Sequence, residues 1–206
     1  MDPARVKGNE VINKLVKILD EAQEKLDFQP KYFDAAVLEA PAGGYILEFG
    51  VGEGTTINRM AQVVPHRQIY GFDWFKGLPE YWKGEIGVGA FAQDAIPEVK
   101  KNVTLIEGLF QDTLDNWLQY HPGPVGLAHL DADLYSSTIF VLDRLMPRLY
   151  PGSVLIFDEI YGINRTADPN WSHEGKAFVQ FLVSSWFDFE PLGGRHREGF
   201  AFRLAR

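Results

Sequence analysis

Apolar residues recur at helical spacing through the first part of the chain. The positions that carry this pattern are Val11, Ile12, Leu15, Val16, Leu19, Ala22 and Leu26. Because such spacing lines one face of a helix, it predicts an amphipathic helix, which Pro30 ends. With a shorter helix expected over Lys31–Glu39, residues 1–42 form a helical extension. The first helix could pack on its own domain, cover a ligand site or join two copies of the chain into a homo-oligomer.

From residue 45 onwards, short apolar runs alternate with amphipathic segments. The predicted strands are Tyr45–Phe49, Gln68–Phe72, Val103–Glu107, Val125–Leu130, Ser153–Phe157, Phe187–Leu192 and Gly199–Leu204. The predicted helices between them are Thr55–Val64, Gln111–His121, Ser136–Leu149 and Glu174–Trp186. This alternation predicts a Rossmann-like α/β fold with a doubly wound, mostly parallel sheet. The last two strands have no long helix between them, so we expect an antiparallel pair at one edge.

Length and composition narrow the class of protein. The 206 residues with 46% hydrophobic content suit one domain, with an α/β core over residues 43–206. The net charge is -8 without a basic block, which argues against a nucleic-acid partner. Cysteine is absent, so disulfides and thiolate chemistry are excluded. No apolar run reaches the about 18–20 residues that span a membrane, and the N-terminus lacks a signal-peptide layout. We therefore expect a cytoplasmic protein without a membrane partner.

A glycine-rich turn follows the first predicted strand. Gly50, Gly52 and Gly54 occupy alternate positions there. Glycine lets the backbone turn sharply and lets a ligand approach closely, and the following helix N-terminus offers free N–H groups. These features predict a site for a nucleotide-type cofactor, although such a turn could also serve only to close a strand–helix unit.

Spacing and charge distinguish between cofactors at this turn. A dinucleotide fingerprint reads G-x-G-x-x-G, whereas Thr55 stands here at the position of the third glycine. Glu48 and Glu53 flank the turn and would repel a pyrophosphate, but they tolerate an ammonium and a sulfonium. S-adenosylmethionine carries both of these groups. We expect it as the cofactor, with an NAD(P)-dependent oxidoreductase and a non-catalytic S-adenosylmethionine-binding protein as alternatives.

Acidic residues lie at or just after the ends of five predicted strands. They are Glu48, Asp73, Glu107, Asp131 and Asp158. Ligands of open α/β sheets bind beyond the carboxyl ends of the strands, so these acids should meet at one rim. Asp73 stands where an acid accepts ribose hydroxyls. Gly108 would let the backbone approach an adenine ring, and Phe110 could lie against that ring or pack in the core.

Four carboxylates crowd two neighbouring strand ends: Asp131, Asp133, Asp158 and Glu159. Like charges this close are unfavourable unless a cation neutralises them, and oxygen ligands favour Mg²⁺ or Ca²⁺. Such an ion would bind a substrate hydroxyl and lower its pKa. One carboxylate that does not bind metal, or His129, could then take the proton. Salt bridges and helix caps without metal are the alternative.

The segment from Trp74 to Phe91 is rich in aromatic residues and glycine. A loop of this composition after the second strand should lie over the rim of the sheet. It predicts an acceptor pocket or a lid.

These residues resemble a known family. Glu48–Gly54 resembles the first motif of class I S-adenosylmethionine-dependent methyltransferases. Gly71–Glu80, Glu107–Leu114 and His129–Thr138 resemble segments of the macrocin O-methyltransferase group, and Phe157–Gly162 matches its metal-binding element in part. The resemblance implies Mg²⁺-dependent methylation of a hydroxyl on a small molecule, of a sugar, phenol or natural-product type.

The resemblance, together with the rim, gives the expected site. The residues expected at the methyl donor are Glu48, Gly50, Gly52, Glu53, Thr55, Asp73, Trp74, Gly108, Phe110, Gln111 and Asp131. The implied metal ligands are Asp131, Asp158 and Glu159, and Asp133 is the expected general base, with Asp131 and His129 as further catalytic candidates. Glu159 replaces an aspartate of the group and is one methylene longer, so the ion could shift or bind more weakly.

Overall fold

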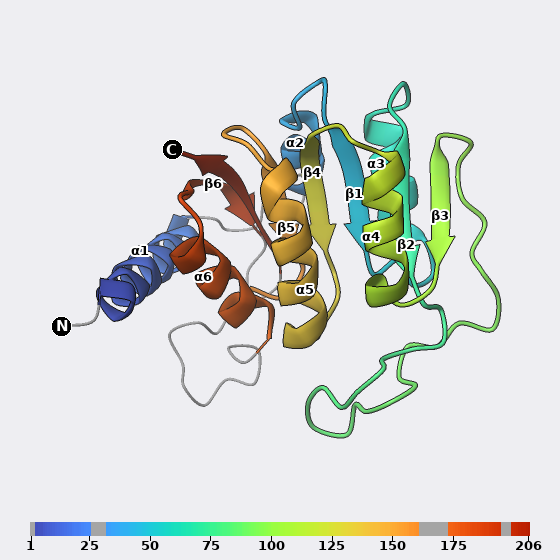
Figure 1. Cartoon of the computed structure of the whole chain (residues 1–206), viewed down its shortest axis with the longest axis horizontal. Helices are drawn as coiled ribbons and strands as arrows, with labels where there is room; N and C mark the ends of the chain where they lie inside the picture. Colours follow the sequence, from blue (N-terminus) through green and yellow to red (C-terminus); the bar gives the residue numbers. More distant parts are fainter. Residues whose placement is uncertain (1–2, 26–31, 161–172, 195–198) are drawn as a thin grey trace.

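The computed structural model describes residues 3–25, 32–160, 173–194 and 199–206 (Figure 1). The strands are β1 (Tyr45–Phe49), β2 (Ile69–Asp73), β3 (Val103–Glu107), β4 (Val125–Leu130), β5 (Val154–Phe157), β6 (Asp188–Gly194) and β7 (Phe200–Ala205). The helices are α1 (Pro3–Lys25), α2 (Tyr32–Leu38), α3 (Thr55–Val63), α4 (Phe110–Tyr120), α5 (Tyr135–Leu145), the 3-10 helix η1 (Met146–Arg148) and α6 (Glu174–Ser184). The last two residues of the segment Phe157–Gly162 lie outside the described residues.

The strands form one sheet in the order β3-β2-β1-β4-β5-β7-β6. β1 to β5 are parallel, and β7 runs antiparallel to both β5 and β6. The predicted Rossmann-like fold and the antiparallel pairing of the last two strands are confirmed. β7 lies between β5 and the edge strand β6. β7 is therefore buried along most of its length, whereas Asp188, Glu190 and Pro191 of β6 are exposed.

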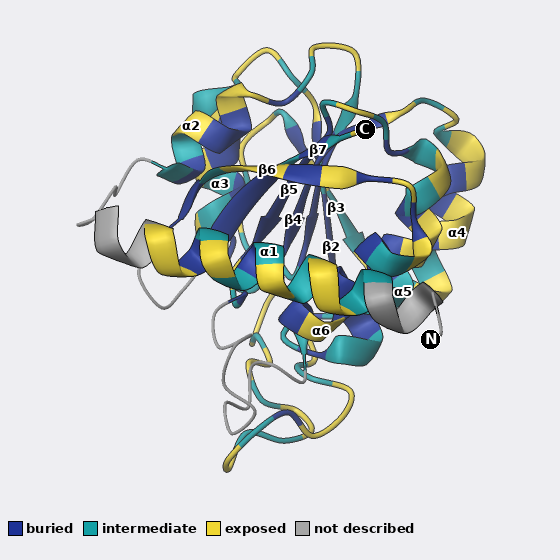
Figure 2. Cartoon of the chain, turned by 90° about the vertical axis from the view of Figure 1, so that its left-hand side faces the viewer, coloured by how far each residue is buried: buried dark blue, intermediate teal, exposed yellow. Residues whose placement is uncertain are grey.

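Helices cover both faces of the sheet, with α2 and α3 on one face and α4, α5 and α6 on the other (Figure 2). Side chains of a strand alternate between faces, so Leu47 and Phe49 of β1 join the core under α4–α6. Ile46 joins the core under α2 and α3. The faces differ in apolar content: most of the phenylalanines in the core lie on the α4–α6 side.

The predicted helix Ser136–Leu149 is shorter in the structure. α5 ends at Leu145 and is followed by one 3-10 turn. Pro147 lies in that turn, and its missing N–H cannot continue the α-helical hydrogen bonds. The order of the predicted elements is otherwise retained.

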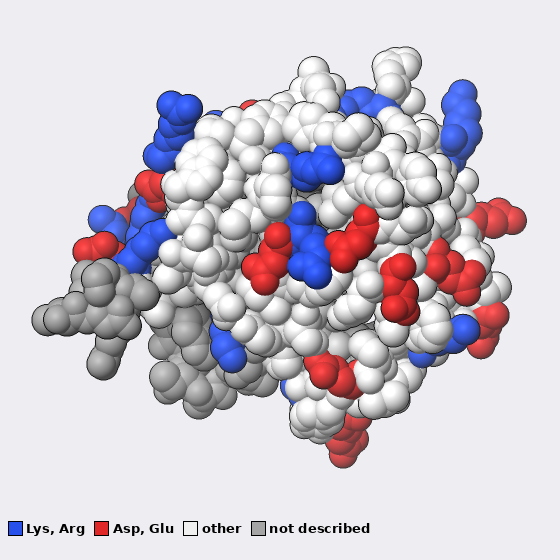
Figure 3. Space-filling view, viewed as in Figure 1, with Lys and Arg blue, Asp and Glu red and all other residues white. Residues whose placement is uncertain are grey.

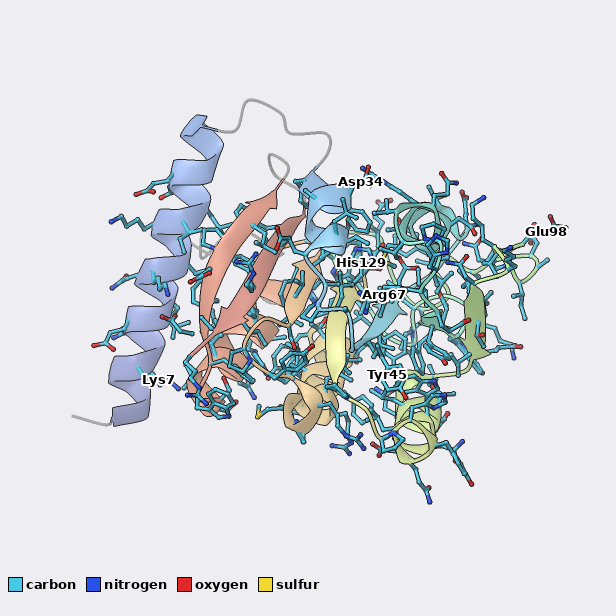
Figure 4. The ribbon with its side chains drawn as sticks, turned by 90° about the horizontal axis from the view of Figure 1, so that it is seen from above. Lys7, Asp34, Tyr45, Arg67, Glu98 and His129 are labelled. Atoms are coloured by element: carbon cyan, nitrogen blue, oxygen red, sulfur yellow. The ribbon has the colours of Figure 1, made fainter. Side chains whose placement is uncertain are left out.

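α1 lies against α6 and the edge strand β6 (Figure 2). Leu15 and Leu19 are buried in the core, and Lys7 donates hydrogen bonds to two carbonyl groups at the end of α6 (Figure 4). Lys14 forms an ion pair with Asp188. Packing on its own domain is therefore the role that the structure shows for α1, and the homo-oligomer stays a prediction. Among the described helices, none is long and apolar enough to cross a membrane.

Candidate functional site

The glycine turn between β1 and α3 has a backbone that only glycine adopts readily. Gly50, Gly52 and Gly54 have φ values of 94°, 52° and 79°. A Cβ on Gly50 would lie 1.8 Å from the carbonyl oxygen of Asp131, so the turn presses directly against the end of β4. A Cβ on Gly52 would meet nothing within 4 Å, which leaves this part of the turn open to a ligand.

Asp73, at the end of β2, holds the turn in place. Its Oδ2 accepts hydrogen bonds from the N–H groups of Val51 at 2.7 Å and Gly52 at 2.8 Å. Its Oδ1 accepts one from the N–H of Phe75 at 2.6 Å. A carboxylate offers about four acceptor positions, so Oδ1 can still accept a hydrogen bond from a ligand.

A cavity of about 520 Å³ opens beside this turn, at the carboxyl ends of the parallel strands. The predicted site residues that line it are Gly50, Gly52, Glu53, Thr55, Asp73, Trp74, Gly108, Phe110, Gln111, Asp131, Asp133, Asp158 and Glu159. Trp74, Leu78, Trp82 and Phe91 contribute an apolar wall from the long segment after β2. Figure 1 shows this segment extending beyond the carboxyl ends of the strands, where the sequence predicted it.

Glu48 and His129 lie behind the turn instead of in the cavity lining. They face each other from β1 and β4, both buried, with 2.9 Å between Glu48 Oε1 and His129 Nδ1. His129 lies in the interior of the molecule, with its ring 5.1 Å from that of Phe33 on α2 (Figure 4). Strand alternation turns the Glu48 side chain to the α2 face, where it is buried, and its contact with the cofactor stays a prediction.

Burial and charge shift both titratable groups of this pair. Burial raises the pKa of Glu48, whose Oε2 has no hydrogen-bond partner among the described residues. Burial opposes protonation of His129, but Glu48, Asp131 and Asp158 outweigh it and raise the pKa of the imidazole. The pair therefore holds a proton tightly between two strands.

Four carboxylates line the cavity at the ends of β4 and β5, as the sequence predicted. Burial, followed by the charge of Asp158, raises the pKa of Asp131 well above its usual range. Burial, followed by the charge of Glu159, raises the pKa of Asp133 to about 7. Asp133 also has a φ of 57°, which costs a residue other than glycine about 1 kcal/mol or more. Strain and a shifted pKa on one side chain are typical of a functional group.

Asp131 and Asp158 fit a divalent cation. One ligand atom from each, together with one from His129, lie within 4.8 Å of one another. Two carboxylates suit Mg²⁺, and a His129 held by Glu48 resembles the carboxylate–histidine pairs that support metal ligands. Glu159, the third ligand implied by the sequence, instead pairs with Lys83 through both oxygens, at 3.1 and 2.9 Å.

Two charged residues of this region make contacts that the sequence did not predict. Lys83, from the aromatic segment, lies 3.5 Å from the centre of the Trp82 ring while it binds Glu159. Glu174, the first residue of α6, is fully buried and accepts hydrogen bonds from the N–H groups of Ala132 and Glu159. Their partners lie far away in the sequence, so no local pattern could have indicated either contact.

The cavity is strongly acidic. Its carboxylates are Glu53, Asp73, Asp131, Asp133, Asp158 and Glu159. Among the described residues that line it, none is a lysine or an arginine. On the face of the molecule seen in Figure 3, basic and acidic side chains are interspersed without a continuous basic patch.

A glycine turn at the point where the strand order reverses, opposite a cluster of acids, defines a nucleotide-type ligand site in an α/β enzyme. Residues 47–160 match the family model described as a methyltransferase domain. The chain is also 30% identical, over 75% of its length and 67% of the relative's, to the 8-demethyl-8-(2,3-dimethoxy-alpha-L-rhamnosyl)-tetracenomycin-C 4'-O-methyltransferase of Streptomyces olivaceus. The chain therefore belongs to this family of methyltransferases.

Solved structures show the same fold. A calicheamicin methyltransferase superposes with a TM-score of 0.67 at 24% identity, covering 95% of this chain and 91% of that one. A mycinamycin methyltransferase, solved in complex with Mg and S-adenosylhomocysteine, gives a TM-score of 0.53 at 16% identity, covering 87% of this chain and 49% of that one. At the level of the family, the prediction of an S-adenosylmethionine-dependent O-methyltransferase is confirmed. Membership of the macrocin group stays a prediction.

Proposed function

We propose that this protein transfers a methyl group from S-adenosylmethionine to a hydroxyl of a small sugar-bearing molecule. The observation that carries the proposal is one cavity in which the glycine turn faces the acids of β4 and β5. A methyl donor on the turn would point its sulfonium toward those acids. The acidic lining favours a ligand with positive charge and opposes the pyrophosphate of NAD(P), so the oxidoreductase alternative is not favoured.

The residues at the turn would hold the donor. The open space at Gly52 and the N-terminus of α3 would receive the methionine carboxylate, with Thr55 at the same helix end. Asp73 would accept a ribose hydroxyl through Oδ1. Gly108 and Phe110, at the end of β3 and the start of α4, would contact the adenine. Trp74, Gln111 and Glu53 complete this part of the lining.

The acidic residues at the end of β4 would orient the acceptor hydroxyl and take its proton. In the reaction, the methyl–sulfur bond breaks with its electron pair left on sulfur, and the acceptor oxygen forms the new bond to carbon. The hydroxyl proton passes to Asp133, whose pKa of about 7 suits a general base near neutral pH. Because the charges of sulfonium and developing oxyanion cancel, a site that excludes water favours the reaction. Asp131 lies beside Asp133 and orients the same hydroxyl.

Asp131 and Asp158 would hold a divalent ion, with His129 or Glu159 as a further ligand. When bound, Mg²⁺ supplies positive charge that lowers the pKa of an acceptor hydroxyl. The support is the set of ligand atoms from Asp131, Asp158 and His129 within 4.8 Å of one another. Burial, followed by the charge of Asp158, also raises the pKa of Asp131. Lys83 neutralises Glu159, which leaves Asp131 and Asp158 as the pair that most needs a cation.

The apolar wall favours an acceptor with an apolar part attached to its hydroxyl-bearing ring. Trp82 is buried in the wall, whereas Phe91, which also lines the cavity, is exposed. Exposed aromatic and apolar side chains beside a cavity commonly contact a ligand. The tetracenomycin relative is named for a 4'-O-methylation of a rhamnosyl compound, and a similar glycoside fits this wall.

Methyl transfer to defined acceptors tests the proposal. The protein is incubated with S-adenosylmethionine and Mg²⁺, and with p-nitrophenyl α-L-rhamnoside or TDP-rhamnose, and mass spectrometry detects methylation. We expect methylated rhamnoside and an equal amount of S-adenosylhomocysteine. Calorimetric binding of NADH without binding of S-adenosylmethionine would contradict the proposal. Tight S-adenosylmethionine binding without transfer would favour the non-catalytic alternative. Methyl transfer that EDTA does not affect would contradict only the role of the metal ion.

A further inference from the structure

We infer that Glu174 is a positioning residue that holds the two acid-bearing loops of the site at their working separation. The inference rests on the proposed function, because it assigns Glu174 to the acids that would serve the acceptor. Glu174 is absent from the cavity lining and is fully buried, so it acts through other residues rather than on a ligand.

The contact is made by both oxygens of one carboxylate. Oε1 accepts a hydrogen bond from the N–H of Ala132 at 3.1 Å, and Oε2 accepts one from the N–H of Glu159 at 3.0 Å. Ala132 lies between Asp131 and Asp133, and Glu159 follows Asp158. Each hydrogen bond therefore fixes the backbone directly next to a carboxylate of the cavity. One side chain joins the end of β4 to the end of β5.

The position of Glu174 suits a carboxyl group that accepts hydrogen bonds from backbone N–H groups. As the first residue of α6, it lies at the positive end of the helix dipole, where a carboxylate is favoured. Burial raises the pKa of the Glu174 carboxyl well above its usual range, and the two N–H donors oppose that rise. An ordinary helix-capping acid would be exposed, as Asp112 is in the first turn of α4. A fully buried acid at this position therefore stabilises the two loops whose N–H groups it binds.

The two loops need such a connection because the carboxylates of Asp131 and Asp158 repel each other when both are ionised. One carboxylate oxygen of Asp131 and one of Asp158 lie within 4.8 Å of each other. Without an attachment between the backbones, the loops could move apart until that repulsion falls. Displacements of about 1 Å at a reacting group can cost about a hundredfold in rate, so the separation of the loops matters for transfer.

Two variants separate this role from general support of the fold. Glu174→Ala removes both acceptors. Glu174→Gln keeps one acceptor oxygen but turns an amide N–H toward the second N–H donor, so it should retain only one of the two ties. Ser153→Ala is the matched control, because Ser153 is fully buried at the other end of β5. Its hydroxyl donates a hydrogen bond to the carbonyl oxygen of Val125 at 2.7 Å.

The test measures kcat and KM with p-nitrophenyl α-L-rhamnoside, S-adenosylmethionine affinity by calorimetry, and Mn²⁺ affinity by electron paramagnetic resonance. Loss of an outer contact of this kind typically reduces activity or metal affinity by about 10–100-fold. We expect that loss in kcat and in Mn²⁺ affinity for Glu174→Ala, a smaller loss for Glu174→Gln, and neither for Ser153→Ala. S-adenosylmethionine affinity should stay within about threefold of wild type, since the glycine turn is unaffected.

A kcat and a Mn²⁺ affinity that both stay within about threefold of wild type in a folded Glu174 variant would overturn the inference. Loss of S-adenosylmethionine affinity in parallel with kcat would also overturn it, because that result indicates collapse of the whole site. If Glu174→Ala does not fold, Glu174→Gln decides by the same measures. If the wild type transfers no methyl group, the proposed function fails, and Mn²⁺ affinity alone tests the role of Glu174. Equal Mn²⁺ affinities of the wild type and the variant, or no Mn²⁺ binding to either, then contradict that role.

Discussion

Asp133 differs from an ordinary surface aspartate in two independent respects. Its backbone has a φ of 57°, and burial together with the charge of Glu159 raises its pKa to about 7. The strained backbone aims the side chain into the cavity, and the shifted pKa makes it able to accept a proton near neutral pH. Asp73 is the second residue with a defined task, because one carboxylate fixes the glycine turn and lines the cavity.

Asp133→Asn removes the proposed base without changing side-chain size. We expect kcat to fall by about 10²–10⁴-fold, the usual contribution of a general base, with S-adenosylmethionine affinity unchanged. Initial rates and calorimetry measure the two quantities. A variant with wild-type kcat would show that another group takes the proton.

Asp73→Ala removes three hydrogen bonds to backbone N–H groups of the turn and its surroundings. Each such bond contributes about 0.5–1.5 kcal/mol, so the turn should lose its fixed shape. We expect S-adenosylmethionine affinity to fall by at least about tenfold in calorimetry. Asp73→Asn, which keeps one acceptor oxygen, should lose less. Unchanged S-adenosylmethionine affinity in both variants would show that Asp73 does not contribute to the donor site.

At the scale of the elements, the apolar pattern predicted nearly every helix and strand, because burial on a defined face leaves a period in the sequence. It also predicted that Asp131 and Asp158 would meet, since parallel strand ends share a rim. The direction of Glu48 could not be predicted, because alternation does not say which face carries the cavity. Contacts made by Glu174 and Lys83 span 42 and 76 positions, which only the folded chain brings together.

α1 gives a test at this scale. Leu15 is fully buried where α1 packs on the sheet, so Leu15→Ala should lower the free energy of unfolding by about 2–5 kcal/mol. Lys17→Ala, on the exposed face of the same helix, should change it by less than about 0.5 kcal/mol. Denaturant titration measures both. Equal and small effects would mean that α1 does not belong to the core and is available for a partner.

The whole molecule concentrates its unfavourable charge at one rim of the sheet. Burial raises the pKa of Glu48, Asp131 and Glu174, and it raises that of Asp133 from 3.8 to about 7. A carboxyl with a raised pKa holds its proton more tightly in the folded state than in the unfolded state. The free energy of unfolding therefore falls as pH rises between about 4 and 7.

We expect the EDTA-treated protein to melt at a higher temperature at pH 5.5 than at pH 7.5. A change of 1 kcal/mol corresponds to about 2–4 °C for a chain of this size. Added Mg²⁺ should recover stability at pH 7.5 more than at pH 5.5, because only ionised carboxylates bind it well. Asp133→Asn should flatten the profile. A melting temperature that rises over this window would contradict the assignment of the raised pKa values.

The central claim is that this cavity transfers a methyl group from S-adenosylmethionine to a hydroxyl oxygen. The most direct measurement supplies S-adenosylmethionine labelled with ¹³C in the methyl group and follows the label by nuclear magnetic resonance, with p-nitrophenyl α-L-rhamnoside as acceptor. The claim predicts that the sulfonium methyl signal is replaced by an O-methyl signal of equal intensity, and that Asp133→Asn suppresses this change. A label that stays on sulfur while the donor is bound would contradict it.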